Sequence, residues 1–186
     1  MVIRDLDGDG HPDLAITNEE DATLSVLLNQ GKGTFATVVN YPTELHPRSL
    51  VAADFNGDRL TDLAVACIGL YESGKWVSVY LNQGHGVLAA RVNYEVDVTP
   101  GDLATGDLNG DGIVDLVSAT FGNAGPDNTL SLLLGRGDGT FKPKLDDPIG
   151  FEADRIAVAD LNGDGLYDVT TVSAGDDRLS EILLCR

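Results

Sequence analysis

Oxygen-bearing side chains recur at fixed positions in four copies of a nine-residue loop. Each copy has Asp or Asn at loop positions 1, 3, 5 and 9, and the copies span residues 5–13, 54–62, 107–115 and 160–168. Carboxylates held this close together repel one another unless a cation lies between them. Calcium is the natural candidate, because it takes six to eight hard oxygen ligands in flexible geometry. The repeated spacing therefore predicts one calcium ion in each loop.

The predicted ligands are the side chains at positions 1, 3, 5 and 9 and the backbone carbonyl at position 7. The side-chain ligands are predicted to be Asp5, Asp7, Asp9 and Asp13; Asp54, Asn56, Asp58 and Asp62; Asp107, Asn109, Asp111 and Asp115; and Asp160, Asn162, Asp164 and Asp168. The carbonyl ligands are predicted to come from His11, Leu60, Ile113 and Leu166. The sequence thus predicts about four Ca²⁺ ions and no catalytic or organic cofactor site.

Position 6 separates the second loop from the other three. Gly10, Gly112 and Gly165 occupy it elsewhere and permit the sharp turn, which requires a positive φ. The second loop has Arg59, which has to adopt a left-handed backbone and adds a positive charge beside the ion. We therefore expect the second calcium site to be the weakest.

An EF-hand and a simple turn are the two alternatives to such a calcium loop. An EF-hand needs a bidentate Glu at position 12 and a helix beyond it, but that position falls inside an apolar, strand-like segment in every copy: Ile16, Val65, Ser118 and Thr171. Loops rich in Asp and Gly can also be simple turns, but four copies at matching positions favour metal binding. Without the Glu, affinity falls toward the micromolar-to-millimolar range, which suits extracellular calcium.

Short apolar segments flank each loop and predict β-strands. One segment precedes the loop, one follows it, and a third alternates apolar and polar residues. A Gly-x-Gly turn then leads to a fourth segment, which is predicted to start at Phe35, Leu88 and Phe141. Four antiparallel strands per repeat of about 50 residues describe one blade of a β-propeller. The sequence predicts an all-β chain, with residues 1–186 forming a single propeller segment of about four four-stranded blades. The approximate repeats are residues 1–45, 46–98, 99–151 and 152–186.

The repeats at the two ends are shorter than the central ones. Only residues 1–4 precede the first loop, and the fourth copy stops after its third predicted strand. The chain therefore predicts an incomplete ring, completed by blades from a longer chain or by a second copy, with a closed four-bladed ring as the alternative. Exposed strand edges and apolar blade faces in an open arc would favour self-association.

The loops followed by Asp-Leu pairs resemble a known repeat. The pairs are Asp13-Leu14, Asp62-Leu63 and Asp115-Leu116, and residues 27–35 match as well. Together they resemble the FG-GAP-like (VCBS-type) repeat family, which is related to the calcium-bearing blades of integrin α-subunit propellers. The resemblance covers nearly the whole chain and implies a propeller, usually seven-bladed, in a secreted or cell-surface protein. It leaves the ligand open, because the family includes adhesion proteins, lectins and accessory domains of enzymes.

The charge of the chain limits the partners that we expect. The formal net charge is -18, and thirteen of the 30 acidic residues lie in the four loops. Four bound Ca²⁺ ions would add +8 and change the net charge to -10. An acidic surface disfavours nucleic acid and anionic membranes, whose phosphates attract basic proteins. No apolar run approaches the roughly 18 residues of a membrane span, and no signal peptide is recognisable. We expect neither nucleic-acid binding nor membrane insertion.

Outside the repeat pattern, the sequence offers no acid, base and nucleophile set that could form an active site. The leading hypothesis is a non-catalytic, calcium-stabilised module that binds protein or glycan outside the cell. The alternatives are a propeller segment of a larger secreted polysaccharide-active enzyme, and a lectin with sites between blades. Flanking sequence would distinguish the enzyme segment, and glycan-array binding would identify the lectin.

Several smaller motifs favour structural roles. Arg136-Gly137-Asp138 spells a tripeptide that some integrins recognise, but it occupies the same turn as the Gly-x-Gly motifs of the other repeats. Cys67 and Cys185 lie in apolar runs of different repeats and are expected to be small buried hydrophobes rather than a disulfide. An aromatic platform of Tyr71, Trp76 and Tyr80 could stack on a sugar, although packing within the sheet is favoured.

Overall fold

The computed structural model describes residues 1–70, 74–120, 128–149, 153–173 and 178–183. These residues form antiparallel sheets and contain no α-helix. The first sheet has the order β1-β2-β3-β4 and consists of β1 (Val2–Arg4), β2 (Asp13–Asn18), β3 (Thr23–Leu27) and β4 (Val39–Pro42). The second has the order β5-β6-β7-β8 and consists of β5 (Pro47–Ala53), β6 (Asp62–Cys67), β7 (Trp76–Tyr80) and β8 (Val92–Glu95).

The third sheet repeats this pattern, and the fourth repeats its first three strands. The third sheet consists of β9 (Pro100–Gly106), β10 (Asp115–Thr120), β11 (Thr129–Leu133) and β12 (Leu145–Pro148). The fourth has the order β13-β14-β15 and consists of β13 (Arg155–Ala159), β14 (Asp168–Ser173) and β15 (Arg178–Leu183). The prediction of an all-β, incomplete propeller is confirmed.

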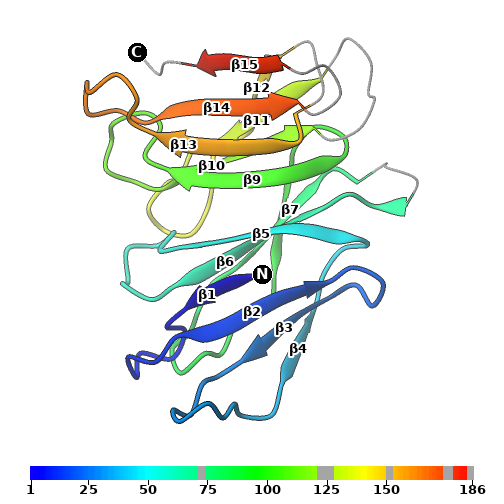
Figure 1. The fold of residues 1–186 in the computed structure, drawn as a ribbon, viewed down its shortest axis with the longest axis vertical. Coiled ribbons are helices and arrows are strands. Elements are labelled where there is room, and N and C mark those ends of the chain that lie inside the picture. The colour runs from blue at the N-terminus through cyan, green and yellow to red at the C-terminus, as the bar shows by residue number, and fades with distance from the viewer. Residues whose placement is uncertain (71–73, 121–127, 150–152, 174–177, 184–186) are drawn as a thin grey trace.

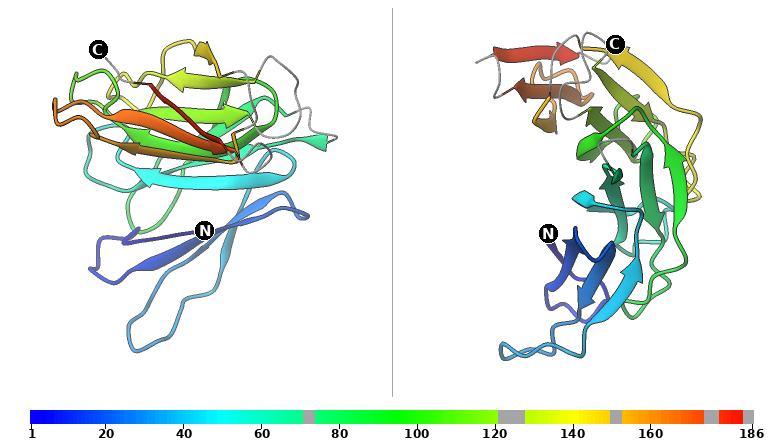
Figure 2. Two further views of the ribbon diagram at one scale, coloured as in Figure 1. Left: turned by 45° about the horizontal axis from the view of Figure 1, so that its top comes forward. Right: turned by 90° about the vertical axis from the view of Figure 1, so that its right-hand side faces the viewer.

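The four sheets are stacked along an open arc (Figure 1). The first strands of successive sheets lie on the concave side, and the fourth strands lie on the convex side (Figure 2, right). Along the concave side β5 contacts β9, and β9 contacts β13. Small side chains such as Ala52 and Ala104 in these strands allow the close approach. The four predicted calcium loops, each joining a first strand to a second strand, lie along one edge of the arc, on the left in Figure 1.

Each junction between neighbouring sheets contains its own apolar core. Leu24 and Val26 of the first sheet pack with Leu63 and Val65 of the second, and two similar clusters fill the next two junctions. The six residues of β6 are all buried, because side chains alternate between the two faces of a strand and both faces of this sheet are covered. The middle strands therefore read as continuous apolar runs rather than as alternating ones.

The fourth strands begin later than the sequence predicts. Phe35, Leu88 and Phe141 make only isolated β-bridges, to Asn29, Asn82 and Gly135, and regular pairing starts four residues further on, at Val39, Val92 and Leu145. The physical reason is that the Gly-x-Gly turn is closed locally, as where the Gln30 N–H donates to the Thr34 carbonyl at 2.8 Å. Leu88 and Phe141 are buried in the junction cores, so they anchor the turn rather than start a strand.

The cysteines and the aromatic residues of the smaller motifs differ in burial. Cys67 is a buried, free thiol in the core between the first two sheets, and burial raises its pKa to about 12, so it behaves as a small hydrophobe. Tyr80 is buried in the same core, whereas Trp76 is exposed. Tyr71 and Cys185 lie outside the described residues. Over the described part of the chain, no helix is long and apolar enough to cross a membrane.

Candidate calcium loops

The aspartate at position 1 organises each loop around its own carboxylate. Asp5 accepts the Gly8 N–H through Oδ1 at 2.8 Å and the Gly10 N–H through Oδ2 at 2.9 Å. Asp54, Asp107 and Asp160 accept N–H groups from the same two loop positions. The chain thus wraps around the carboxylate. Each carboxylate oxygen has two lone pairs, so these hydrogen bonds leave it able to bind a cation.

Positions 3 and 5 form short side-chain turns. Asp7 Oδ1 accepts the Asp9 N–H at 3.1 Å, and Asp9 Oδ1 accepts the His11 N–H at 2.7 Å. The same pair of bonds recurs in the other loops, from Asn56 and Asp58, Asn109 and Asp111, and Asn162 and Asp164. Asx turns of this kind explain why Asp and Asn are interchangeable at position 3.

The backbone of position 6 is left-handed in all four loops. The φ angle is +86° at Gly10 and +70° at Arg59. A non-Gly residue pays a steric cost there, so Arg59 is held in place by the rest of its loop, as its N–H donating to Asp54 Oδ2 at 2.8 Å illustrates. Position 4 is also left-handed, at Gly8, Gly57, Gly110 and Gly163. This second left-handed position was not predicted from the sequence, although a Gly at position 4 in every copy was the signal for it.

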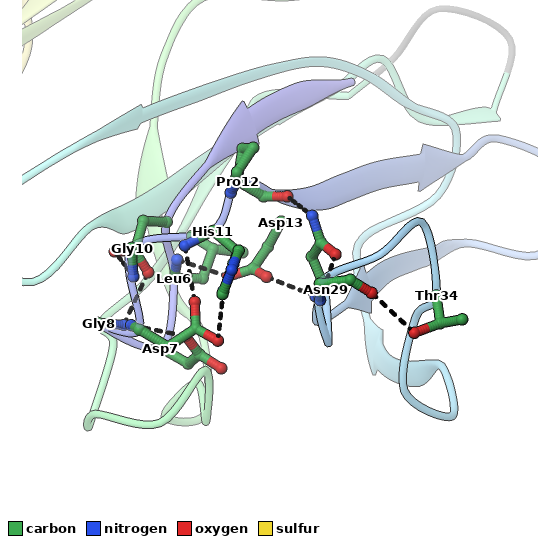
Figure 3. Close-up of polar contacts among 12 residues, drawn as sticks. Leu6, Asp7, Gly8, Gly10, His11, Pro12, Asp13, Asn29 and Thr34 are labelled. Atoms are coloured by element: carbon green, nitrogen blue, oxygen red, sulfur yellow. Dashed lines mark hydrogen bonds and ion pairs between the residues drawn. The ribbon is translucent and has the colours of Figure 1, made fainter.

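The aspartate at position 9 ties three segments of its sheet together. Asp13 is fully buried; its Oδ2 accepts the Leu6 N–H at 2.7 Å and its Oδ1 accepts the Asn29 N–H at 2.7 Å (Figure 3). Asp62 and Asp115 make the same two bonds. Each of these carboxylates joins the start of the loop to the end of the third strand. Position 9 is therefore a structural clamp, whether or not it also binds an ion.

Burial dominates the electrostatics of Asp62 and Asp115, the position-9 aspartates of the second and third loops. It raises the pKa of Asp62 to about 6, although the two backbone N–H donors lower the pKa and the charges of Asp58 and Asp54 raise it further. The pKa of Asp115 is raised for the same principal reason. A nearby cation would stabilise the charged form of these carboxylates and offset this cost.

The first loop brings three predicted ligands into one cluster. One carboxylate oxygen from each of Asp5, Asp7 and Asp13 lies within 4.8 Å of the other two. Burial raises the pKa of Asp7, and the charges of Asp13, Asp9 and Asp5 add to that rise. Mutual repulsion among hard oxygen donors at this spacing fits a divalent cation such as Ca²⁺. The residues present therefore fit the predicted ion.

Asp9 stands apart from this cluster. Its Oδ2 lies 3.1 Å from Nδ1 of His11, and hydrogen bonds from the backbone and side chain of His11 lower the pKa of Asp9. The Asp9 carboxylate also raises the pKa of His11. The predicted ligand at position 5 is thus paired with the imidazole of His11, whereas the ligand predicted at position 7 is the His11 backbone carbonyl. Calcium would have to compete with the His11 side chain for Asp9. The other three loops have no such competitor, because position 7 is Leu60, Ile113 or Leu166.

The loops also reach across the junctions between sheets. The carbonyl of Leu6, at position 2 of the first loop, accepts the Gly86 N–H of the second sheet at 3.1 Å. The carbonyl of Phe55 accepts the Gly139 N–H of the third sheet in the same way, at 3.1 Å. Each of these two loops is therefore bonded to the Gly-x-Gly turn of the following sheet. The sequence does not predict that the calcium loop of one sheet contacts the Gly-x-Gly turn of the next. Their repeated order along the chain was the one indication of this contact.

The repeat pattern matches a known family model over most of the chain. The model of the FG-GAP-like repeat matches residues 5–65, 54–118 and 107–171, each match running from one loop into the strand beyond the next. The chain belongs to the FG-GAP-like repeat family. A comparison with curated proteins found no match to this FG-GAP-like chain.

Two solved structures resemble the FG-GAP-like chain in fold. One is a lectin of Agrocybe aegerita, described as specifically recognising non-reducing terminal N-acetylglucosamine. It is 24% identical in sequence, with a TM-score of 0.58, and the match covers 97% of this chain and 50% of the lectin. The other is the Tc holotoxin pore of Photorhabdus luminescens with the TccC3-D651A mutation, at 18% identity and a TM-score of 0.53 over 94% of this chain and 8% of that one. The chain thus spans at most half the length of these neighbours.

Proposed function

We propose that this FG-GAP-like chain is a non-catalytic, calcium-stabilised propeller module that recognises a glycan or protein outside the cell. The observation that carries the proposal is the oxygen cluster of Asp5, Asp7 and Asp13 in a loop whose hydrogen-bonding pattern recurs in the other three sheets. In this proposal, each loop holds one Ca²⁺ through positions 1, 3, 5 and 9 and the position-7 carbonyl. A bound ion supplies positive charge that relieves carboxylate repulsion.

Calcium in these loops would have a mainly structural role. The loops lie on one edge of the arc, and the first two are bonded to the Gly-x-Gly turn of the following sheet, as Leu6 is to Gly86. An ion that fixes a loop also fixes the backbone groups that reach the next sheet. The stability of the junctions would then depend on the calcium concentration.

A glycan is the ligand class that we favour. Two hollows of similar size lie between neighbouring sheets, one of about 450 Å³ lined by Tyr41 and one of about 440 Å³ lined by Tyr94. These volumes fall in the range of about 300–1,000 Å³ that is typical of small-ligand sites. Tyrosine offers both a flat apolar surface and a hydroxyl group, which suits sugar rings. The lectin from Agrocybe aegerita, which matches over 97% of this chain, supports the same choice.

Calcium binding is tested by calorimetric titration of chelator-treated, buffer-exchanged protein. We expect about four sites per chain, and Asp107→Asn should remove one of them. Asp147→Asn, an exposed carboxylate on β12 outside the loops, is the matched control and should leave the number of sites unchanged. Binding of one ion or none at millimolar calcium would refute the proposal.

Ligand recognition is tested separately on a glycan array, with calcium and with chelator. Binding to a defined set of glycans would support the module as a lectin. Calcium-dependent turnover of a polysaccharide, abolished by one substitution outside the loops, would instead favour the alternative of a segment from a secreted polysaccharide-active enzyme.

A further inference from the structure

The two hollows between sheets are related by the repeat but differ in charge. Tyr41 and Arg91 line the first, and Tyr94 and Lys144, each 53 residues later, line the second. Ala89 in the first hollow corresponds to Lys142 in the second. The second hollow is also lined by Arg136, whose counterpart is Gln83. The chain therefore contains a neutral and a cationic version of one site.

The first hollow has no free positive charge among its described lining residues. The guanidinium of Arg91, the one cation lining it, donates to Glu44 Oε1 at 2.7 Å and to the Pro42 carbonyl at 3.1 Å. The aromatic groups there are also engaged, since the Tyr80 hydroxyl donates to the Pro42 carbonyl at 2.9 Å. This hollow has nearly the volume of the second, but its one cation is already paired with Glu44.

The second hollow has cations that are not neutralised by partners. Lys144 pairs with Asp146 at 2.6 Å, but Arg136 and Lys142 make no salt bridge within the described residues. Asp138, two residues from Arg136, accepts hydrogen bonds from Thr140 N and Oγ1 at 2.9 and 2.6 Å instead. Three of the twelve Lys and Arg residues of this acidic chain thus line one hollow, beside a single acid, Glu95.

An aromatic surface lies beside these cations. The Tyr94 ring is half-buried and is held edge-on against Phe141, with 5.1 Å between the ring centres. The Tyr94 hydroxyl donates to the Gly139 carbonyl at 3.4 Å, which fixes the ring in the wall of the hollow. A fixed aromatic ring next to unpaired cations suits a ligand with one apolar ring face and one negative group.

We propose that the hollow between β8 and the segment 136–144, which precedes β12, binds a sugar residue that carries a carboxylate, such as a hexuronate at a glycan terminus. Tyr94 contacts the sugar ring, and Arg136 and Lys142 bind the carboxylate. A single anion is favoured over an acidic peptide, because Glu95 lines the hollow, Asp146 is paired with Lys144 in its wall and Asp138 lies close to Tyr94, and these charges repel extended polyanions. The inference rests on the proposed glycan-binding function and specifies the ligand of one of its sites.

The test is a titration of the calcium-loaded chain with methyl glucuronide and methyl galacturonide, followed by NMR, with methyl glucoside and methyl galactoside as neutral counterparts. We expect the uronides to bind about tenfold more tightly than the neutral sugars, in line with charge-assisted hydrogen bonds. The double variant R136Q/K142Q should lose that preference. The double variant K32Q/K75Q removes the same charge from exposed positions elsewhere and should retain it.

A gain-of-function variant provides the complementary experiment. Q83R/A89K introduces counterparts of Arg136 and Lys142, the two unpaired cations of the second hollow, into the first and should add a second uronide site per chain. Equal affinity for uronides and neutral sugars would overturn the proposed anion preference while leaving glycan binding intact. Binding of an Asp-rich peptide in place of any sugar, sensitive to R136Q/K142Q, would overturn both this inference and the glycan ligand.

Discussion

The side-chain amide of Asn82 donates to the backbone carbonyl of Leu6 at 2.8 Å, although the two residues are 76 positions apart. Leu6 is position 2 of the first loop, and Asn82 follows the third strand of the second sheet. The same amide also donates to the Thr61 carbonyl of the second loop at 3.0 Å. One buried side chain therefore joins two predicted calcium loops across a junction between sheets.

Replacing Asn82 should loosen that junction. The repeat supplies a matched control in Asn29, which bonds to Pro12 and Gly31 of its own sheet much as Asn82 bonds to Thr61 and Gly84. Asn82→Ala should cost about 1–3 kcal/mol of unfolding free energy, because it leaves buried groups unpaired. Asn29→Ala should cost less. Urea denaturation in calcium measures both, and equal costs would argue that the bond to Leu6 contributes nothing.

Calcium removal should lower the melting temperature strongly. A site occupied at 100 times its dissociation constant contributes about 2.7 kcal/mol, so four independent sites would contribute on the order of 10 kcal/mol, comparable with the stability of a whole domain. Scanning calorimetry with calcium and with excess chelator measures the effect. An unchanged melting temperature in chelator would contradict a structural role for the ion.

The four loops should differ in affinity. Arg59 places a strained backbone and a positive charge in the second loop, whereas Gly112 occupies the same position in the third. Asp111→Ala should therefore destabilise the calcium-loaded chain more than Asp58→Ala. Melting temperatures of both variants in calcium provide the comparison. A larger loss from Asp58→Ala would show that Arg59 does not weaken its loop.

Acid should weaken one contact near the first hollow. Glu44 Oε1 accepts hydrogen bonds from Arg91 and Asn93 at 2.7 Å each, and these bonds hold the pKa of Glu44 below its ordinary value of 4.5. A lowered pKa means that the contact stabilises the fold above that ordinary value and is lost as the pH falls through the lower folded-state value. Glu44→Gln should be less stable than the parent chain near neutral pH by about 0.2–1 kcal/mol, since the pair is partly exposed.

That difference should disappear in acid. Urea denaturation of the Glu44→Gln and parent chains at the same pH measures it, because calcium release affects both proteins alike. Once the pH has fallen below the lowered folded-state pKa of Glu44, the two stabilities should converge, since Glu44 is then protonated in the parent chain. A gap that persists unchanged at low pH would show that the charge of Glu44 is not what stabilises the contact.

The last described sheet leaves an apolar face uncovered. Leu161 is 56% exposed, whereas Leu108, at the same position one repeat earlier, is 2% exposed beneath the fourth sheet. Val172 is also exposed. We therefore expect another blade, from a longer chain or a second copy, to cover this face.

Sedimentation of the 186-residue chain tests that expectation. Leu161→Asp should reduce self-association without lowering the stability of the monomer. Leu145→Asp is the control, because Leu145 is equally exposed, at 56%, but lies on the convex strand β12. Equal effects of the two substitutions would show that association is not directed to this face.

The sequence alone determined the local features of this protein. The spacing of Asp, Asn and Gly specifies each loop, because the Asx turns and left-handed residues depend only on neighbours a few positions away. The repeat of about 50 residues then indicated sheets of four strands, and hence a propeller. The start of the fourth strands could not be predicted in this way. Leu88 and Phe141 are apolar because they pack in the cores between sheets, and they precede the paired strands.

Only the tertiary structure decided which groups meet across the junctions. It showed that Asp13, Asp62 and Asp115 clamp their loops to the third strands, and that Leu6 bonds to Asn82 of the next sheet. It also showed that Tyr94, Arg136 and Lys142 line one hollow, although they come from different sheets. These contacts depend on how neighbouring sheets stack. Stacking is set by side-chain packing summed over whole sheets, and no short stretch of sequence contains that information.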